Sequence, residues 1–198
     1  MKNLVVNLGM NSIIKENKYD EIKLQEIRYG LEALYLNISK LTVYFIINAF
    51  LGIFKEGLLF LLFYVPLRSF SYGFHAKSSL VCWLLSGVSF VILPYIATII
   101  NLNIYFKFGI ILFSLIIYYL YSPADTSARP IINKKRRLIL KILTLVIAII
   151  YSLIIILNNN SIINIIAFAL LYQSILITPI FYKLFKMRYN NYLYYGLN

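Results

Sequence analysis

The single histidine and the single cysteine of this chain, His75 and Cys82, lie seven residues apart in a short polar stretch between apolar runs. Together they form a minimal unit of nucleophilic catalysis. The imidazole accepts the thiol proton, the thiolate attacks, and the imidazolium returns the proton to the leaving group. Composition alone also permits a plainer interpretation, in which the cysteine is a small apolar filler and the histidine an interfacial anchor.

Helix geometry limits how such a pair could work. On one continuous helix, seven residues correspond to about 10.5 Å along the axis. Proton transfer needs about 2.6–3.2 Å or one bridging water. A working pair therefore requires His75 on a bend that folds back over the start of the helix holding Cys82. Gly73 provides the backbone freedom for that bend.

The residues after the bend predict where that helix begins. Ser78 or Ser79 would be its N-cap. Cys82 would then lie in or near the first turn, where the helix dipole favours a thiolate. Arg68 and Lys77 would add positive potential nearby.

The elements that must position this stretch are those of a membrane protein. Of the 198 residues, 61% are hydrophobic and 13% are charged, and the mean hydropathy is +0.79. Such a chain has too little polar surface to cover itself in water. Its first residues contain no apolar core of signal-peptide length, so we expect no cleaved leader. The sequence predicts an all-α, polytopic integral membrane protein in a single domain, residues 1–198.

The net charge of +12 raises the question of a nucleic-acid partner. The basic residues cluster at the ends of apolar runs and do not alternate with stacking aromatics, which favours positive-inside topology and no nucleic acid. A single cysteine excludes an intrachain disulfide, and with one histidine it is too little for a structural zinc site. We therefore expect no metal and no cofactor.

The charges also predict the topology. The first two apolar runs are short and are separated by Lys55 and Glu56, so they form either one long span with a buried ion pair or a hairpin of two spans. A hairpin places 15 of the 19 basic residues on one side, whereas a single span leaves 10 there. Loop charge asymmetry thus favours about six transmembrane helices with both termini in the cytoplasm. The runs are 41–54, 57–67, 80–100, 104–121, 138–157 and 162–182.

Residues 1–40 are predicted to be an amphipathic N-terminal region, 41–186 the transmembrane helices and 187–198 a cytoplasmic tail. Apolar residues recur at three- and four-residue steps from Leu24 to Leu41, which is typical of an amphipathic helix that runs into the first span. This helix could lie on the inner leaflet, dock a partner helix, or pack on the protein's own cytoplasmic face.

Two motifs resemble those of a known family. The first is Arg68-x4-Gly73-x-His75-Ala76-x5-Cys82, and the second is Ser-Pro-Ala-Asp-Thr-x-x-Arg-Pro-Ile at 122–131. Both resemble the accessory gene regulator B (AgrB) family of membrane peptidases, as do the chain length and the order of apolar runs. Phe74 departs from the pattern, because many members have a second glycine there. We expect it to stiffen the bend and to leave the pair intact.

The resemblance implies a cysteine endopeptidase of Gram-positive quorum sensing, in the cell membrane, with its active site at the cytoplasmic face. Such a protein removes the C-terminal tail of an AgrD-like propeptide. Cys82 would form the acyl-enzyme, and His75 would act as base and then as acid. A propeptide cysteine or serine would then close a thiolactone or lactone. The resemblance also implies a homodimer.

Supporting roles follow for several other residues. Arg68 matches the motif arginine and could stabilise an oxyanion, hold a substrate carboxylate or anchor the span. Gly73 would be conformational. Asp125 is the best candidate to orient His75, although it could equally bond its own backbone in a turn. A basic cluster would attract an acidic substrate tail or touch anionic lipid. Its members are Lys134, Lys135, Arg136 and Arg137.

Two other functions compete with a peptidase. A small transporter or peptide exporter would carry ionisable residues at mid-span or repeated halves. Here charges lie near the span ends, and no internal repeat is evident. A non-catalytic membrane assembly factor would contain the histidine and cysteine by chance.

Overall fold

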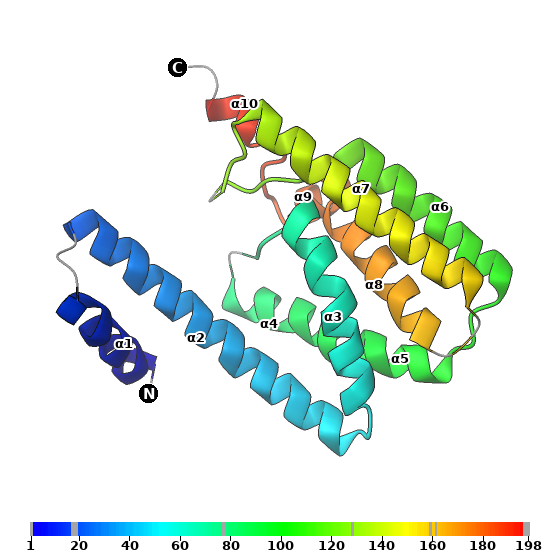
Figure 1. Ribbon diagram of the computed structural model, residues 1–198, viewed down its shortest axis with the longest axis horizontal. Helices are drawn as coiled ribbons and strands as arrows, with labels where there is room; N and C mark the ends of the chain where they lie inside the picture. The colour runs from blue at the N-terminus through cyan, green and yellow to red at the C-terminus, as the bar shows by residue number, and fades with distance from the viewer. Residues whose placement is uncertain are drawn as a thin grey trace. The chain divides into compact units, whose positions relative to one another are not determined.

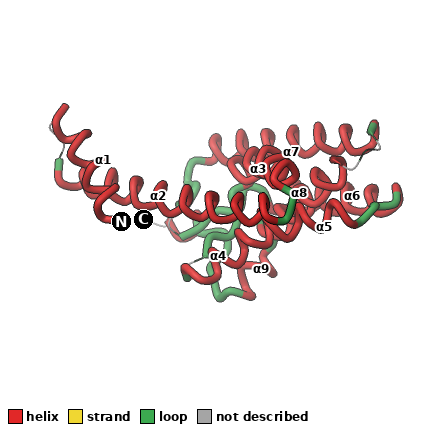
Figure 2. The backbone as a smooth tube through the Cα atoms, turned by 90° about the horizontal axis from the view of Figure 1, so that it is seen from below, coloured by secondary structure: helices red, strands yellow, loops and turns green. Residues whose placement is uncertain are grey.

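The computed structural model describes residues 2–16, 20–76, 78–127, 129–158, 160 and 162–195. In these residues the backbone is helical apart from loops, and its only β-type pairings are two isolated bridges (Figure 2). The chain forms two compact units, Met1–Ile47 and Asn48–Asn198. The all-α prediction is confirmed. That the units act as one domain stays a prediction.

The first unit contains α1 (Lys2–Glu16) and most of α2 (Glu21–Phe50). As predicted, the amphipathic segment and the first apolar run form one continuous helix of 30 residues. Helix α1 was not predicted from the sequence as a separate helix. It packs on α2 through Gly9, where an added Cβ would lie 3.2 Å from the Leu31 side chain.

The second unit begins at a sharp turn between α2 and α3 (Phe54–Ser71), where Gly52 has a φ of +71°. The amide of Asn48 lies against Gly57, so any side chain on that glycine would collide with it. Nine residues of unbroken helix would separate the two positions by about 13.5 Å. The chain therefore turns here, so the two apolar runs do not form one continuous helix. That they cross the membrane as a hairpin of two spans stays a prediction.

Most helices of the second unit follow the predicted apolar runs (Figure 1). One run is not a uniform helix, because a π-helical segment, η1, interrupts it. Another breaks before Pro179, which cannot donate a backbone hydrogen bond. The elements are α4 (Ser79–Gly87), η1 (Val88–Ile92), α5 (Leu93–Ile99), α6 (Ile104–Tyr121), α7 (Lys134–Leu157), α8 (Ile162–Leu176), α9 (Pro179–Leu184) and α10 (Tyr192–Tyr195).

Four helical stretches among the described residues are long and apolar enough to cross a membrane: Glu21–Phe50, Leu80–Ile99, Ile104–Tyr121 and Lys134–Leu157. Their large apolar side chains are widely exposed, as a lipid environment allows. Helix α8 is shorter and mostly buried, because it packs against α3, α5, α6 and α7. The protein is thus a polytopic membrane protein, and a count of six spans requires α3 and α8 to cross as well.

Helix ends meet on one side of the second unit, which we call the loop end. Backbone hydrogen bonds there join the end of α3 to the loop after α6 (Ala124 N to Ser71 O, 2.9 Å) and the segment after α3 to the end of α8 (Phe74 N to Leu176 O, 3.1 Å). Helix α7 also begins here, since Arg136 of its first turn donates to the Tyr72 hydroxyl at 3.4 Å. These loops of the second unit therefore lie together, and their predicted position at the cytoplasmic face stays a prediction.

Candidate functional site

The predicted bend lies between α3 and α4. Helix α3 ends at Ser71 and α4 begins at Ser79, so no single helix runs through both His75 and Cys82. His75 lies in the non-helical segment between them and is exposed, with its Nδ1 3.2 Å from the carbonyl of Ala76. The half-buried Cys82 lies at the start of α4, where its N–H donates to the Ser78 carbonyl at 3.1 Å.

The start of α4 lies where it was predicted, but the predicted capping hydrogen bond is not formed. Ser78 occupies the N-cap position, but its hydroxyl makes no capping hydrogen bond. Cys82 lies within the first turn, where the helix dipole favours negative charge. Lys77, predicted to add positive potential, lies outside the described residues.

The bend is held by its own arginine. Tyr72 and Gly73 have φ values of +57° and +110°, which reverse the chain directly after α3. Arg68, one turn before the end of α3, donates from Nη1 to the Tyr72 carbonyl at 3.0 Å and from Nη2 to the Phe74 carbonyl. The motif arginine therefore braces the segment that carries His75. Its predicted roles toward an oxyanion or a substrate carboxylate stay predictions.

The second motif braces the same bend from outside. The Gly73 N–H donates to the Ala124 carbonyl at 2.7 Å, and Tyr72 and Ala124 form an isolated parallel bridge. From α8, Gln173 Nε2 donates to the Tyr72 carbonyl at 2.7 Å and to the Ser71 hydroxyl at 2.6 Å. The two sequence motifs are thus in direct contact, although about 50 residues of chain separate them.

Phe74, the departure from the family pattern, anchors the bend. Its side chain is only 3% exposed and packs against the rings of Phe181, Tyr182 and Phe185 at centroid distances of 5.2, 6.1 and 4.7 Å. Such aromatic packing adds about 0.5–1.5 kcal/mol per pair beyond the buried area. Phe74 therefore fixes the backbone directly before His75, as expected of a residue that stiffens the bend.

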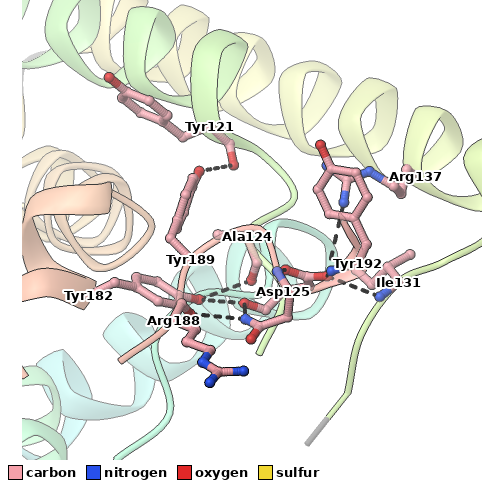
Figure 3. Close-up of polar contacts among 10 residues, drawn as sticks. Tyr121, Ala124, Asp125, Ile131, Arg137, Tyr182, Arg188, Tyr189 and Tyr192 are labelled. Atoms are coloured by element: carbon pink, nitrogen blue, oxygen red, sulfur yellow. Dashed lines mark hydrogen bonds and ion pairs between the residues drawn. The ribbon is translucent and has the colours of Figure 1, made fainter. Parts of the chain in front are cut away.

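Asp125 directly follows Ala124, which accepts from the bend, and it lies at the centre of a polar cluster (Figure 3). It is 1% exposed, and its carboxylate accepts backbone hydrogen bonds from Ile131 (3.2 Å), Asn191 (2.9 Å) and Tyr192 (2.8 Å). Arg137 Nη1 lies 4.0 Å from Oδ2. The carboxylate thus ties its own loop and the C-terminal segment together. Orientation of His75 by Asp125 stays a prediction.

The C-terminal partners of this cluster were not predicted from the sequence. Asn191 and Tyr192 bond Asp125 across more than 60 residues, and the Tyr182 hydroxyl donates to the Ala124 and Asp125 carbonyls at 3.2 and 3.1 Å. The one sequence signal is composition, because residues 189–195 are all Tyr, Asn or Leu in a region predicted as a tail.

The four residues of the basic cluster separate into two groups. Lys134, Lys135 and Arg136 are exposed on the first turn of α7, which Asn133 caps by accepting from the Arg136 N–H at 3.2 Å. Arg137 turns inward, with its guanidinium 3.3 Å from the centroid of the Tyr192 ring. The first three are exposed to the surroundings, whereas Arg137 is half-buried. Among the described residues, no group of three or more His, Cys, Asp or Glu side chains could hold a metal ion.

Replacing Gly73 by alanine tests the bend. A Cβ would lie 2.8 Å from Arg68 Nη1, 3.0 Å from Ile177 Cγ2 and 3.3 Å from the Leu176 carbonyl, at a φ that favours glycine. We expect a loss of about 1–3 kcal/mol in unfolding free energy, measured by thermal unfolding in detergent. Gly109→Ala is the control, since nothing lies within 4 Å of its added Cβ. Equal stability of the two variants would contradict the strained bend.

The chain is similar to a family of known proteins over most of its length. The accessory gene regulator B family model matches residues 6–177. An AgrB-like protein of Clostridium acetobutylicum is 31% identical over 95% of this chain and 89% of its own length. An AgrB-like protein of Listeria innocua is 33% identical over 88% of this chain and 86% of its own. The accessory gene regulator protein B of Staphylococcus epidermidis is 31% identical over 85% of this chain and 86% of its own length.

This polytopic membrane protein therefore belongs to the accessory gene regulator B family. Membership implies a role in the processing of a quorum-sensing signal. No solved structure matches the chain significantly.

Proposed function

We propose that this protein is a membrane cysteine endopeptidase that removes the C-terminal tail of a quorum-sensing propeptide. The observation that carries the proposal is the braced bend between α3 and α4, with exposed His75 on it and Cys82 in the first turn of the helix that follows. A bend is what a histidine and a cysteine seven residues apart require for proton transfer.

In the proposed reaction, His75 takes the Cys82 proton and the thiolate adds to the scissile carbonyl carbon. The C–N bond then breaks, His75 protonates the leaving amine, and an acyl-thioester remains on Cys82. A thiolate within the propeptide next displaces Cys82 from the thioester. One C–S bond breaks and another forms, which gives a thiolactone and regenerates the enzyme. Because this exchange is nearly isoenergetic, ring closure competes well where water is excluded.

The proposal also includes the substrate, the side of the membrane and the oligomeric state. The substrate is an AgrD-like propeptide with an acidic tail, attracted by exposed Lys134, Lys135 and Arg136. The loop end faces the cytoplasm of a Gram-positive bacterium, since basic residues favour that side. The active form is a homodimer in the cell membrane.

Co-expression with the cognate propeptide tests this function. We expect mass spectrometry to detect the released tail and a ring-closed product. The mass of this product should be one water lower than that of the linear N-terminal fragment that hydrolysis of the same bond would give. Exposure of the cells to a thiol-alkylating reagent should add one label to Cys82 and stop tail release. Intact propeptide found outside the cells, with no released tail, would instead identify a peptide exporter and contradict the proposal.

A further inference from the structure

A cavity lies at the loop end, formed by residues that take no part in the proposed reaction. It has a volume of about 420 Å³ and lies between the end of α6, the start of α7 and the C-terminal segment. Its polar lining includes Tyr121, Ser122, Arg137, Lys141, Tyr189 and Tyr192. The volume is in the range of small-ligand sites.

The charge of this cavity is positive. Arg137 and Lys141 are four residues apart on α7 and therefore lie on the same face. Asp125 Oδ2 lies 4.0 Å from Arg137 Nη1, and the Asp125 carboxylate already accepts from three backbone N–H groups. Lys141 Nζ lies 4.7 Å from the centroid of the Tyr119 ring. The side chains that line the cavity thus present two cations and no carboxylate.

At this cavity, Ser122 Oγ is a buried polar atom without a hydrogen-bond partner among the described residues, in a residue only 6% exposed. Arg137 Nη1 also makes no hydrogen bond there, but it lies 4.0 Å from Asp125 Oδ2. Buried polar atoms are nearly always satisfied, so each such exception requires an explanation. The neighbouring hydroxyl of Tyr189 is already used, because it donates to the Tyr121 carbonyl at 3.3 Å. Burial raises the pKa of Tyr189, which keeps this hydroxyl uncharged next to an anion.

The surroundings of the cavity distinguish a lipid from a soluble anion. It opens where two candidate spans end, and its lining also includes Leu120 of α6 and Leu138 of α7. From there both helices expose large apolar side chains along their length, including Ile116 on α6 and Ile142 on α7. A basic and aromatic pocket at the membrane boundary, continuous with apolar helix faces, is how phospholipid headgroups are bound.

We propose that this cavity binds the phosphate of an anionic phospholipid, with Lys141, Arg137 and Ser122 as its ligands and the acyl chains along α6 and α7. Ser122 is adjacent to the loop whose Ala124 accepts from Gly73. A bound lipid would therefore also stabilise the loop that braces the bend. The site does not depend on the proposed peptidase activity, because it is tested by lipid retention.

Native mass spectrometry of the full-length protein after exchange into phosphatidylglycerol or phosphatidylcholine tests the site. We expect preferential retention of phosphatidylglycerol, reduced about fivefold in Lys141→Gln and about threefold in Ser122→Ala. Lys135→Gln is the matched control, since it removes the same charge from an exposed position on the same helix. It should stay within about twofold of the unmodified protein.

Three results would overturn this site. Equal retention of both lipids would exclude recognition of an anionic headgroup. An equal loss in Lys135→Gln would assign the effect to general surface charge. Displacement of phosphatidylglycerol by millimolar inorganic phosphate would identify a site for a soluble anion instead of a lipid.

Discussion

Cys82→Ala is expected to abolish release of the propeptide tail, with a loss of at least about 10³-fold in rate, because no covalent route remains without the thiolate. Cys82→Ser should lose nearly as much, since a hydroxyl is a far weaker nucleophile than a thiol at neutral pH. His75→Ala should lower the rate by about 10²–10⁴-fold, the usual contribution of a positioned general base. Tail release from the co-expressed propeptide, followed by mass spectrometry, measures all three.

Two neighbouring serines provide control variants, because replacing them changes a side chain of the same segment and leaves His75 and Cys82 in place. Ser86 lies one turn after Cys82 on α4, and Ser86→Ala removes its hydroxyl. Ser78→Ala removes an exposed N-cap hydroxyl that makes no capping hydrogen bond. Both variants should cleave within about twofold of the unmodified protein. Cleavage at the normal rate by Cys82→Ala, with the variant present in the membrane, would end the peptidase proposal.

Local sequence features were sufficient to predict the bend. Gly73 supplies the left-handed backbone, and the serines after it begin α4, so the break between His75 and Cys82 follows from residues within ten positions of each other. The break between α2 and α3 was also predicted, because charge asymmetry between loops is a property of the whole chain that needs no knowledge of packing.

Features that depend on contacts between distant segments were not predicted. From the sequence, the basic cluster consists of four equivalent cations. Helix α7 begins directly after Asn133, and this register directs Arg137 inward, whereas its three neighbours are exposed. The π-helical segment also has no periodic signature. Its backbone is held from outside the run, since Asn48 Nδ2 donates to the Phe90 carbonyl at 2.8 Å.

Phe74 illustrates how a departure from a motif is explained by packing. A second glycine at this position would leave the bend dependent on hydrogen bonds alone. Here a buried ring packs among Phe181, Tyr182 and Phe185, so hydrophobic contact fixes the residue before His75. Preorganisation of this kind reduces the entropy that must be lost when a reacting group is positioned.

Asp125→Ala is expected to destabilise the protein by about 3–5 kcal/mol, because three backbone N–H groups lose the carboxylate that accepts from them and each hydrogen bond to a charged group contributes about 1.5–3 kcal/mol. The substitution removes the acceptor for the Ile131, Asn191 and Tyr192 N–H groups and leaves Arg137 uncompensated. Asp125→Asn should lose somewhat less, because one carbonyl oxygen remains to accept. Thermal unfolding in detergent and proteolysis of the C-terminal segment measure the effect, and surface-exposed Glu26→Gln, expected within about 0.5 kcal/mol, is the control for loss of a carboxylate.

The same variants separate the two roles of Asp125. A carboxylate that only ties the C-terminal segment to the loop affects cleavage through stability, so activity should return when Asp125→Asn is assayed well below its unfolding temperature. A carboxylate that orients His75 would instead leave cleavage impaired by about 10²-fold or more at every temperature, with the fold intact. We expect the first result, because both carboxylate oxygens accept from the backbone in this structure. A persistent loss in the folded variant would make Asp125 the third member of the catalytic group.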